Sequence, residues 1–467
     1  MDLDSEARFA AYVDALGSVI GRADRSGPLR DYCTGLILPG ERKSVEPMAA
    51  RTAPAHVSAQ HQSLLHFVGA GGWSDEKVLA KVSELVTPAI TRHGSIEVWI
   101  IDDTGLPKKG RHSVGVKPQY CGQLGKEANC QVAVSLSIAN HFASLPIGYR
   151  LYLPREWAED HARRDRAGVP EDIRFKTKQQ IALELIQRAH GSGIPPGVLL
   201  MDLDYGRDSR LRASISAMGL SYVVGIQPNV LMWPVGAIPK RPDKALNNTG
   251  RRDQPDLISA KEVVRALPKH AWRTIEWREG SSDWLSSRFA RVRVRVGYNG
   301  AIPGQLAEEW LLIEWPEAEI EPTKYWLATL PADISFRRLV DIAKMRWRIE
   351  RDYQELKQEV GLGHYEGRGW RGFHHHATLC IAAYGFLVSE RAAIPPQELV
   401  SPRCSRRLPY PTVIDPEDPP LRPERHIPNS IATMRARLIR GLANRLPRCP
   451  CCGNNPPRLR TERHMTQ

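Results

Sequence analysis

The sequence predicts an α/β protein whose central sheet has strands of mixed direction. Three strand-like apolar segments follow one another between residues 95 and 154, separated by turn residues. Helix-like and strand-like segments then alternate between residues 176 and 227. A second strand-rich stretch covers residues 270–330. Consecutive strands followed by helix–strand alternation favour a mixed sheet covered by helices.

The first 92 residues are expected to be mostly helical. Residues 5–20 and 74–90 carry apolar side chains at helical spacing, and Ser74 or Asp75 is a suitable cap for the second helix. A basic stretch and a short helical candidate at 61–68 lie between them. This region is interpreted either as a domain that binds DNA ends or as a packing domain, and the sequence favours neither.

Acidic residues stand at the ends of two predicted strands. The apolar run that starts at Ser95 ends in Asp102 and Asp103, and the run at 197–201 is followed by Asp202. Two amphipathic helices are predicted nearby, at 176–193 and 208–219. The first ends in glycine residues, which favour a helix terminus.

The strand-rich stretch carries a basic pattern of period two. Arg291, Arg293 and Arg295 alternate with valines, which places the guanidinium groups on one face of a strand and the valines on the other. That face suits DNA phosphates, or it is a solvated face of the sheet. Pro, Gly, Asn and Arg dominate residues 228–255, so a loop or linker is predicted before the strands.

Two helices and an arm are predicted after the strands. One long helix should run from about Ser335 to Val360 and contain Glu350, and another should cover residues 372–393. Beyond residue 394 the chain is rich in Pro and Arg, which indicates a poorly ordered arm with one helix at 429–446. The predicted domains are 1–92 (helical), 93–230 (first part of the core), 231–333 (β-rich insertion), 334–395 (second part of the core) and 396–467 (C-terminal arm).

Composition limits the class of protein. The chain has 467 residues, 42% of them hydrophobic and 25% charged, with a net charge of +13. The positive charge favours a polyanion such as nucleic acid over the alternative of a merely basic protein. No apolar run is long enough to span a membrane, and the first residues lack the apolar segment of a signal peptide. We therefore expect a cytoplasmic, nucleoid-associated protein with no membrane partner.

The cysteines are scattered, which is typical of a reducing compartment. Only Cys449, Cys451 and Cys452 cluster, and His464 is the one plausible further ligand. A structural zinc site usually takes four ligands in two spaced pairs, so a solvated Arg-rich tail is favoured over zinc.

Asp103, Asp202 and Glu350 are the candidate catalytic acids. Carboxylates at strand ends, with a third on a later helix, can hold divalent ions at a sheet edge, because Mg²⁺ prefers oxygen ligands. Two such ions can activate water and stabilise a leaving oxygen in phosphoryl transfer. Taken singly, an Asp at a strand end more often caps a helix or a turn.

The motifs around these acids resemble those of the DDE transposases of bacterial insertion sequences. In that group the third acid lies in a Y-x2-R-x3-E-x6-K signature, and Arg346, Glu350 and Lys357 fit it, whereas Ala343 replaces the Tyr. The segment RWRIE around the Glu is itself typical of the group. The resemblance covers roughly residues 35–395.

The first two acid regions also resemble those of the family. IDDTG at 101–105 is similar to the first region, in which the metal ligand is the Asp before Thr. That position is Asp103 here, with Asp102 as its rival. LLMDLDYG is similar to the second region and points to Asp202, while Asp204 stands where the subgroup often has Gly.

The resemblance implies a fold and a set of DNA contacts. The fold is a ribonuclease-H-like core, interrupted between the second and third acids by a β-rich insertion. Trp326 resembles the Trp that stacks on a flipped base near the cleaved end, although a Trp in a strand is more often part of the core. Arg346 and Lys357 would grip phosphates, the alternative being a helical ion-pair ladder. Residues that follow the first acid would line the DNA channel: Lys108, Lys109, Arg111 and Lys126.

The implied activity is DNA transposition, with double-stranded DNA as partner and a homodimer on paired ends. Water attacks the phosphodiester at each end of the element, and the freed 3′-hydroxyl attacks target DNA, with two Mg²⁺ ions (or Mn²⁺ in their place) held by the acids. The alternatives are a simple Mg²⁺-dependent nuclease and a catalytically silent, domesticated DNA-binding protein. Three adjacent histidines, His374 to His376, are interpreted as polar surface or phosphate contacts, because neighbours on a helix point different ways.

Overall fold

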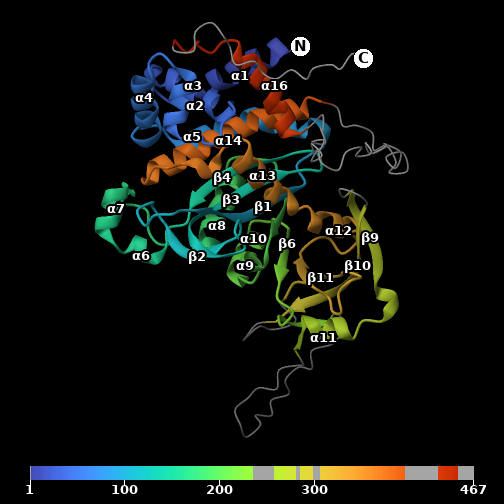
Figure 1. Cartoon of the computed structure of the whole chain (residues 1–467). Coiled ribbons are helices and arrows are strands. Elements are labelled where there is room, and N and C mark those ends of the chain that lie inside the picture. Colours follow the sequence, from blue (N-terminus) through green and yellow to red (C-terminus); the bar gives the residue numbers. More distant parts are fainter. Residues whose placement is uncertain (1, 235–256, 280–283, 298–305, 395–429, 451–467) are drawn as a thin grey trace, which may run out of the picture.

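One continuous twelve-stranded sheet runs through the molecule, with helices packed against it (Figure 1). The computed structural model describes residues 2–234, 257–279, 284–297, 306–394 and 430–450. A group of helices covers one end of the sheet, and the strands of residues 231–328 extend its other end. The predicted mixed α/β architecture is confirmed.

The core of the sheet has the order β4-β3-β1-β5-β6. β1 pairs antiparallel with β3 and parallel with β5, and β5 pairs parallel with β6. This arrangement agrees with the ribonuclease-H-like core that the resemblance implies. Its strands are β1 (Val98–Pro107), β3 (Lys126–Ala139), β4 (Ser144–Leu151), β5 (Val198–Met201) and β6 (Tyr222–Ile226), and β2 (Lys117–Cys121) adds to β3.

The prediction that Asp102 and Asp103 end a strand is wrong. β1 continues to Pro107, because β3 pairs with it along its whole length, from Val98 to Pro107. The parallel ladder between β1 and β5, however, ends at Ile100. Both aspartates therefore lie just beyond the parallel part of the sheet, at its carboxyl edge, although the strand itself runs on.

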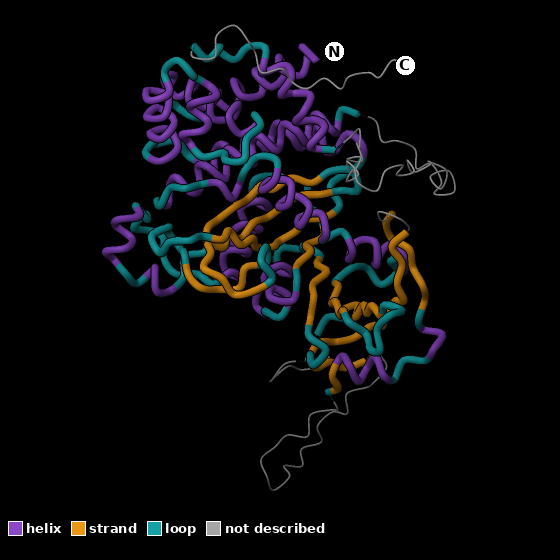
Figure 2. The backbone as a smooth tube through the Cα atoms, in the orientation of Figure 1, coloured by secondary structure: helices purple, strands orange, loops and turns teal. Residues whose placement is uncertain are grey.

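The strands of the interval between the second and third acids belong to the same sheet as the core (Figure 2). β12 pairs antiparallel with β6, so that Tyr325 lies opposite Ile226. The strands predicted at 270–330 are confirmed. β7 falls inside the predicted loop, most of which (235–256) lies outside the described residues. The elements here are β7 (Leu231–Pro234), β8 (Ile258–Ser259), α11 (Ala260–Arg265), β9 (Arg273–Glu279), β10 (Trp284–Val296), β11 (Glu309–Trp315) and β12 (Lys324–Ala328).

The N-terminal region is helical, as predicted. Its helices pack around α14 (Trp370–Ala392), which is buried along nearly all of its length because apolar residues lie on every side of it. Ser74 caps α5, since its side chain accepts a hydrogen bond from the Lys77 amide. The helices are α1 (Asp2–Gly17), α2 (Ser26–Ile37), α3 (Val45–Thr52), α4 (Val57–Gly69) and α5 (Asp75–Ile90).

The remaining helices cover the core and the C-terminal part. The helices predicted at 176–193 and 208–219 are confirmed as α8 and α10. The helix predicted in the C-terminal region is also confirmed, and it packs against α1 and α14 (Figure 1). The bounds are α6 (Arg155–Ala158), α7 (His161–Ala167), α8 (Lys178–Gly191), α9 (Leu203–Gly206), α10 (Ser209–Ala217) and α16 (Ile431–Ala443).

The single long helix predicted from Ser335 to Val360 is two helices, α12 (Phe336–Lys344) and α13 (Trp347–Gln358). At the junction the amide of Met345 bonds to the carbonyl of Ile342, and the next turn also uses i to i−3 bonds. Such bonds tighten the backbone and interrupt the regular ladder. The break lies directly before the turn that carries Glu350.

Candidate active site at the carboxyl edge of the sheet

Asp102 and Asp103 are neighbours on β1 and make different contacts. Asp102 Oδ2 accepts a hydrogen bond of 2.8 Å from Nη1 of Arg346, directly before α13. Asp103 is ion-paired with Lys178, the first residue of α8. Of the two, Asp102 is the one bonded to Arg346, which directly precedes the helix of the third acid. Asp103 is close enough to Asp102 and Asp202 to raise the pKa of both carboxyls.

Asp202 follows β5 and caps the short helix α9. Its Oδ1 accepts hydrogen bonds from the amides of Asp204 (2.9 Å) and Tyr205 (3.3 Å). Burial raises the pKa of the carboxyl, the nearby Arg346 opposes that rise, and Asp103 adds to it. Asp202 therefore caps a helix and also lies within the electrostatic reach of the other acids.

Glu350 lies in the first turn of α13 and is joined to Asp102 through one guanidinium group. Arg346 Nη2 donates to Glu350 Oε1 at 2.7 Å, while Nη1 holds Asp102. Burial raises the pKa of Asp102 to about 7; Arg346 opposes the rise, and the carboxylates of Asp202 and Asp103 reinforce it. The structure thus brings the predicted acids to one edge of the sheet, with cations between them.

Two of the lysines expected to contact DNA also donate hydrogen bonds to the protein backbone. Lys357 Nζ donates to the carbonyl of Gly105 on β1 at 3.1 Å, and Lys108 Nζ donates to the carbonyl of Tyr365 at 2.6 Å. Burial lowers the pKa of both ammonium groups. Lys109, which lies next to Lys108, is exposed, as are Arg111 and Lys126.

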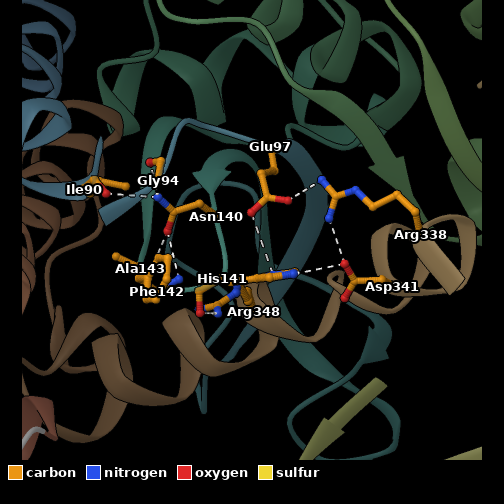
Figure 3. Close-up of polar contacts among 10 residues, drawn as sticks. All are labelled: Ile90, Gly94, Glu97, Asn140, His141, Phe142, Ala143, Arg338, Asp341 and Arg348. Carbon is orange, nitrogen blue, oxygen red and sulfur yellow. Dashed lines mark hydrogen bonds and ion pairs between the residues drawn. The ribbon is translucent and has the colours of Figure 1, made fainter. Parts of the chain in front are cut away.

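A charged network fastens α12 to the core near the start of β1 (Figure 3). Arg338 is ion-paired with Glu97, which precedes β1, and donates to Asp341 at 2.7 Å. His141, in the turn between β3 and β4, lies 3.0 Å from Asp341 through Nε2. Arg348 of α13 also donates to the carbonyl of His141. The network therefore ties α12 and the first turn of α13 to the core.

The residues expected to bind DNA from the insertion are mainly engaged within it. Arg291 donates to the carbonyl of Ile334 at 2.6 Å, and Arg293 and Arg295 both contact Glu308. Their guanidinium groups share one face of β10, as predicted, and that face is partly buried.

Trp326 lies on β12 and is partly buried against the core. It is opposite Gly225 of β6. A Cβ added to Gly225 would lie 3.2 Å from the carbonyl carbon of Asp202, so the Trp lies one strand away from the second acid region. Lys344 Nζ lies 5.9 Å from its ring centroid. This position suits both a Trp of the core and a Trp that stacks on a flipped base.

The interpretation of the three histidines as surface or phosphate contacts is wrong. His374, His375 and His376 are 7%, 2% and 1% exposed. They point in different directions, as expected, but each is bonded to backbone inside the helical layer. His375 stacks on Trp73 and has a carbonyl near each ring nitrogen, of which a neutral ring can donate to only one. Apolar residues on all sides of α14 are the signal that these positions are buried.

Two residues of the site were missed in the sequence. Lys178 opens α8 and reaches Asp103. The hydroxyl of Tyr205 is buried with no hydrogen-bond partner in the described residues, and burial, reinforced by the surrounding aspartates, raises its pKa far above the usual value. Lys178 could not be found by spacing, because 75 residues separate it from Asp103.

The donor set suits a hard divalent cation. Asp102, Asp103, Asp202 and Glu350 offer carboxylate oxygens only, from three elements that meet at one sheet edge. Within the described part of the chain, however, no three Asp, Glu, His or Cys side chains are arranged to hold a metal ion. Arg346 and Lys178 engage these acids instead. Cys451 and Cys452 of the candidate zinc cluster lie outside the described residues.

Comparisons with known proteins agree with this arrangement. A family model described as DDE superfamily endonuclease matches residues 15–283, which is more than half of the chain. The match includes both aspartate regions and ends before Glu350. A probable transposase for insertion sequence element IS701 from Microchaete diplosiphon is 26% identical over 316 residues, covering 65% of this chain and 69% of the relative. No helix in the described ranges has the length and apolarity to cross a bilayer.

Because the family model matches more than half of the chain, the chain belongs to the DDE superfamily of endonucleases.

Proposed function

We propose that this protein is a transposase that cuts DNA at the ends of an insertion sequence and joins the freed ends to target DNA. The observation that carries the proposal is the meeting of four carboxylates at one sheet edge, beside Arg346 and Lys178. The similarity to a probable insertion-sequence transposase supports the DNA substrate. The presence of all three acids disfavours a catalytically silent DNA-binding protein.

Asp103, Asp202 and Glu350 are the proposed metal ligands. Endonucleases of this superfamily generally use divalent metal ions, and the all-oxygen donor set suits Mg²⁺, with Mn²⁺ as a substitute. When bound, two such ions activate water and stabilise the leaving oxygen in phosphoryl transfer.

The cations beside the acids have a separate task. Arg346 stands next to Glu350 and presents a planar guanidinium, which can hold a phosphate through two parallel hydrogen bonds. Lys357 lies on the same helix and now donates to Gly105. Together they would orient the DNA backbone on either side of the scissile bond. Trp326, on the neighbouring strand region, is the proposed stacking partner for an unpaired base.

Asp102 is proposed as a positioning residue. Its carboxylate holds Arg346, and Arg346 in turn holds Glu350, so Asp102 sets the place of both. The resemblance assigns the ligand role to Asp103, whose carboxylate faces Lys178. We expect Asp103→Asn to reduce cleavage more than about 100-fold and Asp102→Asn to reduce it about 10–100-fold, as for groups that orient metal ligands. The reverse order would make Asp102 the first acid.

The test is a cleavage and joining assay on a labelled duplex that carries the element's own terminal repeat, with Mg²⁺. The wild type should nick and join, and Glu350→Gln should do neither while still binding the duplex. Cutting that survives Glu350→Gln would remove Glu350 from the site. Cutting without joining of a pre-cut end would indicate a simple nuclease, and binding without any chemistry in the wild type would indicate a silent DNA-binding protein.

A further inference from the structure

Two cations of the chain itself are bonded to the acids of the site. Lys178, at the start of α8, is ion-paired with Asp103. Arg346, at the start of α13, bridges Asp102 and Glu350 at 2.8 and 2.7 Å. The side chains of Lys178 and Arg346 are each 29% exposed, so the contacts are partly shielded from water but reachable from solution.

The position of Lys178 is unfavourable within its own helix. A cation at a helix N-terminus opposes the helix dipole, which favours negative charge there. Lys178 is the first residue of α8, directly after the cap Thr177. Its ammonium group is therefore stabilised mainly by the carboxylate of Asp103. If that contact is broken, another anion has to stabilise the ammonium group.

The same carboxylate oxygens cannot serve these cations and a divalent ion at once. Asp103 Oδ2 is engaged by Lys178, and Glu350 Oε1 by Arg346. Among the described residues these acids lie at one edge of the sheet without forming a ready group of three ligands. A divalent ion that uses these oxygens competes with the ammonium and guanidinium groups for them.

We propose that Lys178 and Arg346 are built-in counter-cations that keep the site closed to divalent metal ions until the phosphates of DNA draw them away. The proposal rests on the proposed function, because it takes Asp103, Asp202 and Glu350 as metal ligands. Arg346 can exchange a carboxylate for a phosphate, because its guanidinium makes bidentate hydrogen bonds with either group. Lys178 can also exchange its carboxylate for a phosphate, but its ammonium group binds as a point charge. The carboxylates are then free, and DNA and metal bind cooperatively.

Such coupling is reciprocal and measurable. If DNA raises the metal affinity by some factor, metal raises the DNA affinity by the same factor. Typical couplings are about 5- to 150-fold. We therefore expect terminal-repeat DNA to tighten Mn²⁺ binding to the wild-type protein by at least about 10-fold. A pair that serves only to stabilise the fold predicts no such change.

The experiment measures Mn²⁺ binding to the full chain by the electron paramagnetic resonance signal of free Mn²⁺, with and without the duplex. In Lys178→Gln, Asp103 loses its cation, so Mn²⁺ should bind the DNA-free protein about 5- to 50-fold more tightly than it binds the wild type. The gain on adding DNA should shrink accordingly. Lys176→Gln is the matched control, because Lys176 pairs with Glu184 away from the acids.

Two acid variants separate the possible failures. If Glu350→Gln and Asp202→Asn weaken Mn²⁺ binding to the DNA complex while Lys178→Gln binds Mn²⁺ no better than the wild type without DNA, the counter-cation role is refuted and the metal site stands. If neither acid variant changes Mn²⁺ binding, the metal site of the proposed function is itself refuted. Circular dichroism of each variant establishes that the fold is retained.

Discussion

His376 lies in the middle of α14, and both of its ring nitrogens are bonded in a way that suits the neutral ring. Nδ1 accepts from the hydroxyl of Tyr32 at 2.8 Å, and Nε2 donates to the carbonyl of Gly361 at 3.1 Å. Burial lowers the pKa of His376 to about 4, and the hydrogen bond to the backbone of Gly361 opposes part of this shift. In the unfolded chain the pKa returns to its ordinary value of about 6.5.

The folded protein should consequently lose stability as the pH falls. Between about pH 6.5 and pH 4 the His376 ring is protonated in the unfolded chain but stays neutral in the folded protein, so the free energy of unfolding decreases with decreasing pH. From pH 7 to pH 5 this residue accounts for about 2 kcal/mol. In urea unfolding, the free energy of unfolding should fall from pH 7 to pH 5 by about 2 kcal/mol less in His376→Gln than in the wild type. Equal losses would contradict the neutral, buried ring.

Single residues also mark what sequence reasoning can and cannot find. Glu350 and Asp202 occupy the elements predicted for them, since a strand end and a helix face follow from local periodicity. The partner of Asp103 could not be predicted, because Lys178 is brought to it by the packing of α8 on the sheet. The buried histidines were misread because His is polar, although the residues around them are apolar.

At the scale of elements, two glycines allow α9 to pack closely on β6 and so fix Asp202. A Cβ on Gly206 would lie 2.0 Å from the carbonyl oxygen of Gly225, which is a backbone atom of the sheet and cannot easily move. Gly206→Ala should displace α9 and the acid that caps it. We expect a loss of stability of about 1–3 kcal/mol, typical of overpacking, together with impaired cleavage.

The measurement is thermal unfolding and terminal-repeat cleavage of Gly206→Ala beside Gly191→Ala. Gly191 also ends a helix, but a Cβ there meets no atom within 4 Å. Alanine should therefore be tolerated at 191, where it also favours the helix. If both variants behave alike, close packing of α9 does not position Asp202.

The errors in the predicted elements share one physical cause. The extension of β1 to Pro107 depends on pairing with β3, and the break between α12 and α13 coincides with the contact of Arg346 to Asp102. The first involves residues distant in sequence and the second lies beside such a contact, whereas the amphipathic helix α8 and the strands β9 to β12 follow from local periodicity and were predicted. Local patterns therefore predicted the elements, while their ends were decided by tertiary contacts.

At the scale of the whole molecule, the first helix and the last described helix, α1 and α16, meet on the helical layer around α14. Arg445, which follows α16, pairs with Glu6 of α1 at 2.6 Å, and Ser5 donates to Glu390 at the end of α14. Along the sheet, β12 joins β6, so the strands of the interval expected as a β-rich insertion continue the core sheet. The strand periodicity predicted those strands but could not show which sheet they join.

The Pro- and Arg-rich composition of the C-terminal region predicts a poorly ordered arm with one helix, and that helix, α16, is packed and reaches the end of the third-acid helix. Arg435 Nη1 donates to Glu359 Oε2 at 2.9 Å, directly after α13, and its Nε donates to the carbonyl of Ile37 at the end of α2 at 2.7 Å. The side chains of Arg435 and Glu359 are only 15% and 19% exposed, so removing the guanidinium takes a donor from a carboxylate and from the carbonyls of Ile37 and Leu38 in a shielded place.

We therefore expect Arg435→Met to lower the free energy of unfolding by about 1–3 kcal/mol. Arg437→Met is the matched control, since Arg437 lies on the same helix, is exposed, and should tolerate the change within about 0.5 kcal/mol. Denaturant unfolding compares the two, and hydrogen exchange of the α13 amides locates the effect: faster exchange at the end of α13 in Arg435→Met alone would link α16 to the third-acid helix. Equal stability of both variants would mean that α16 merely rests on the helical layer, and the C-terminal region would then be dispensable for positioning Glu350.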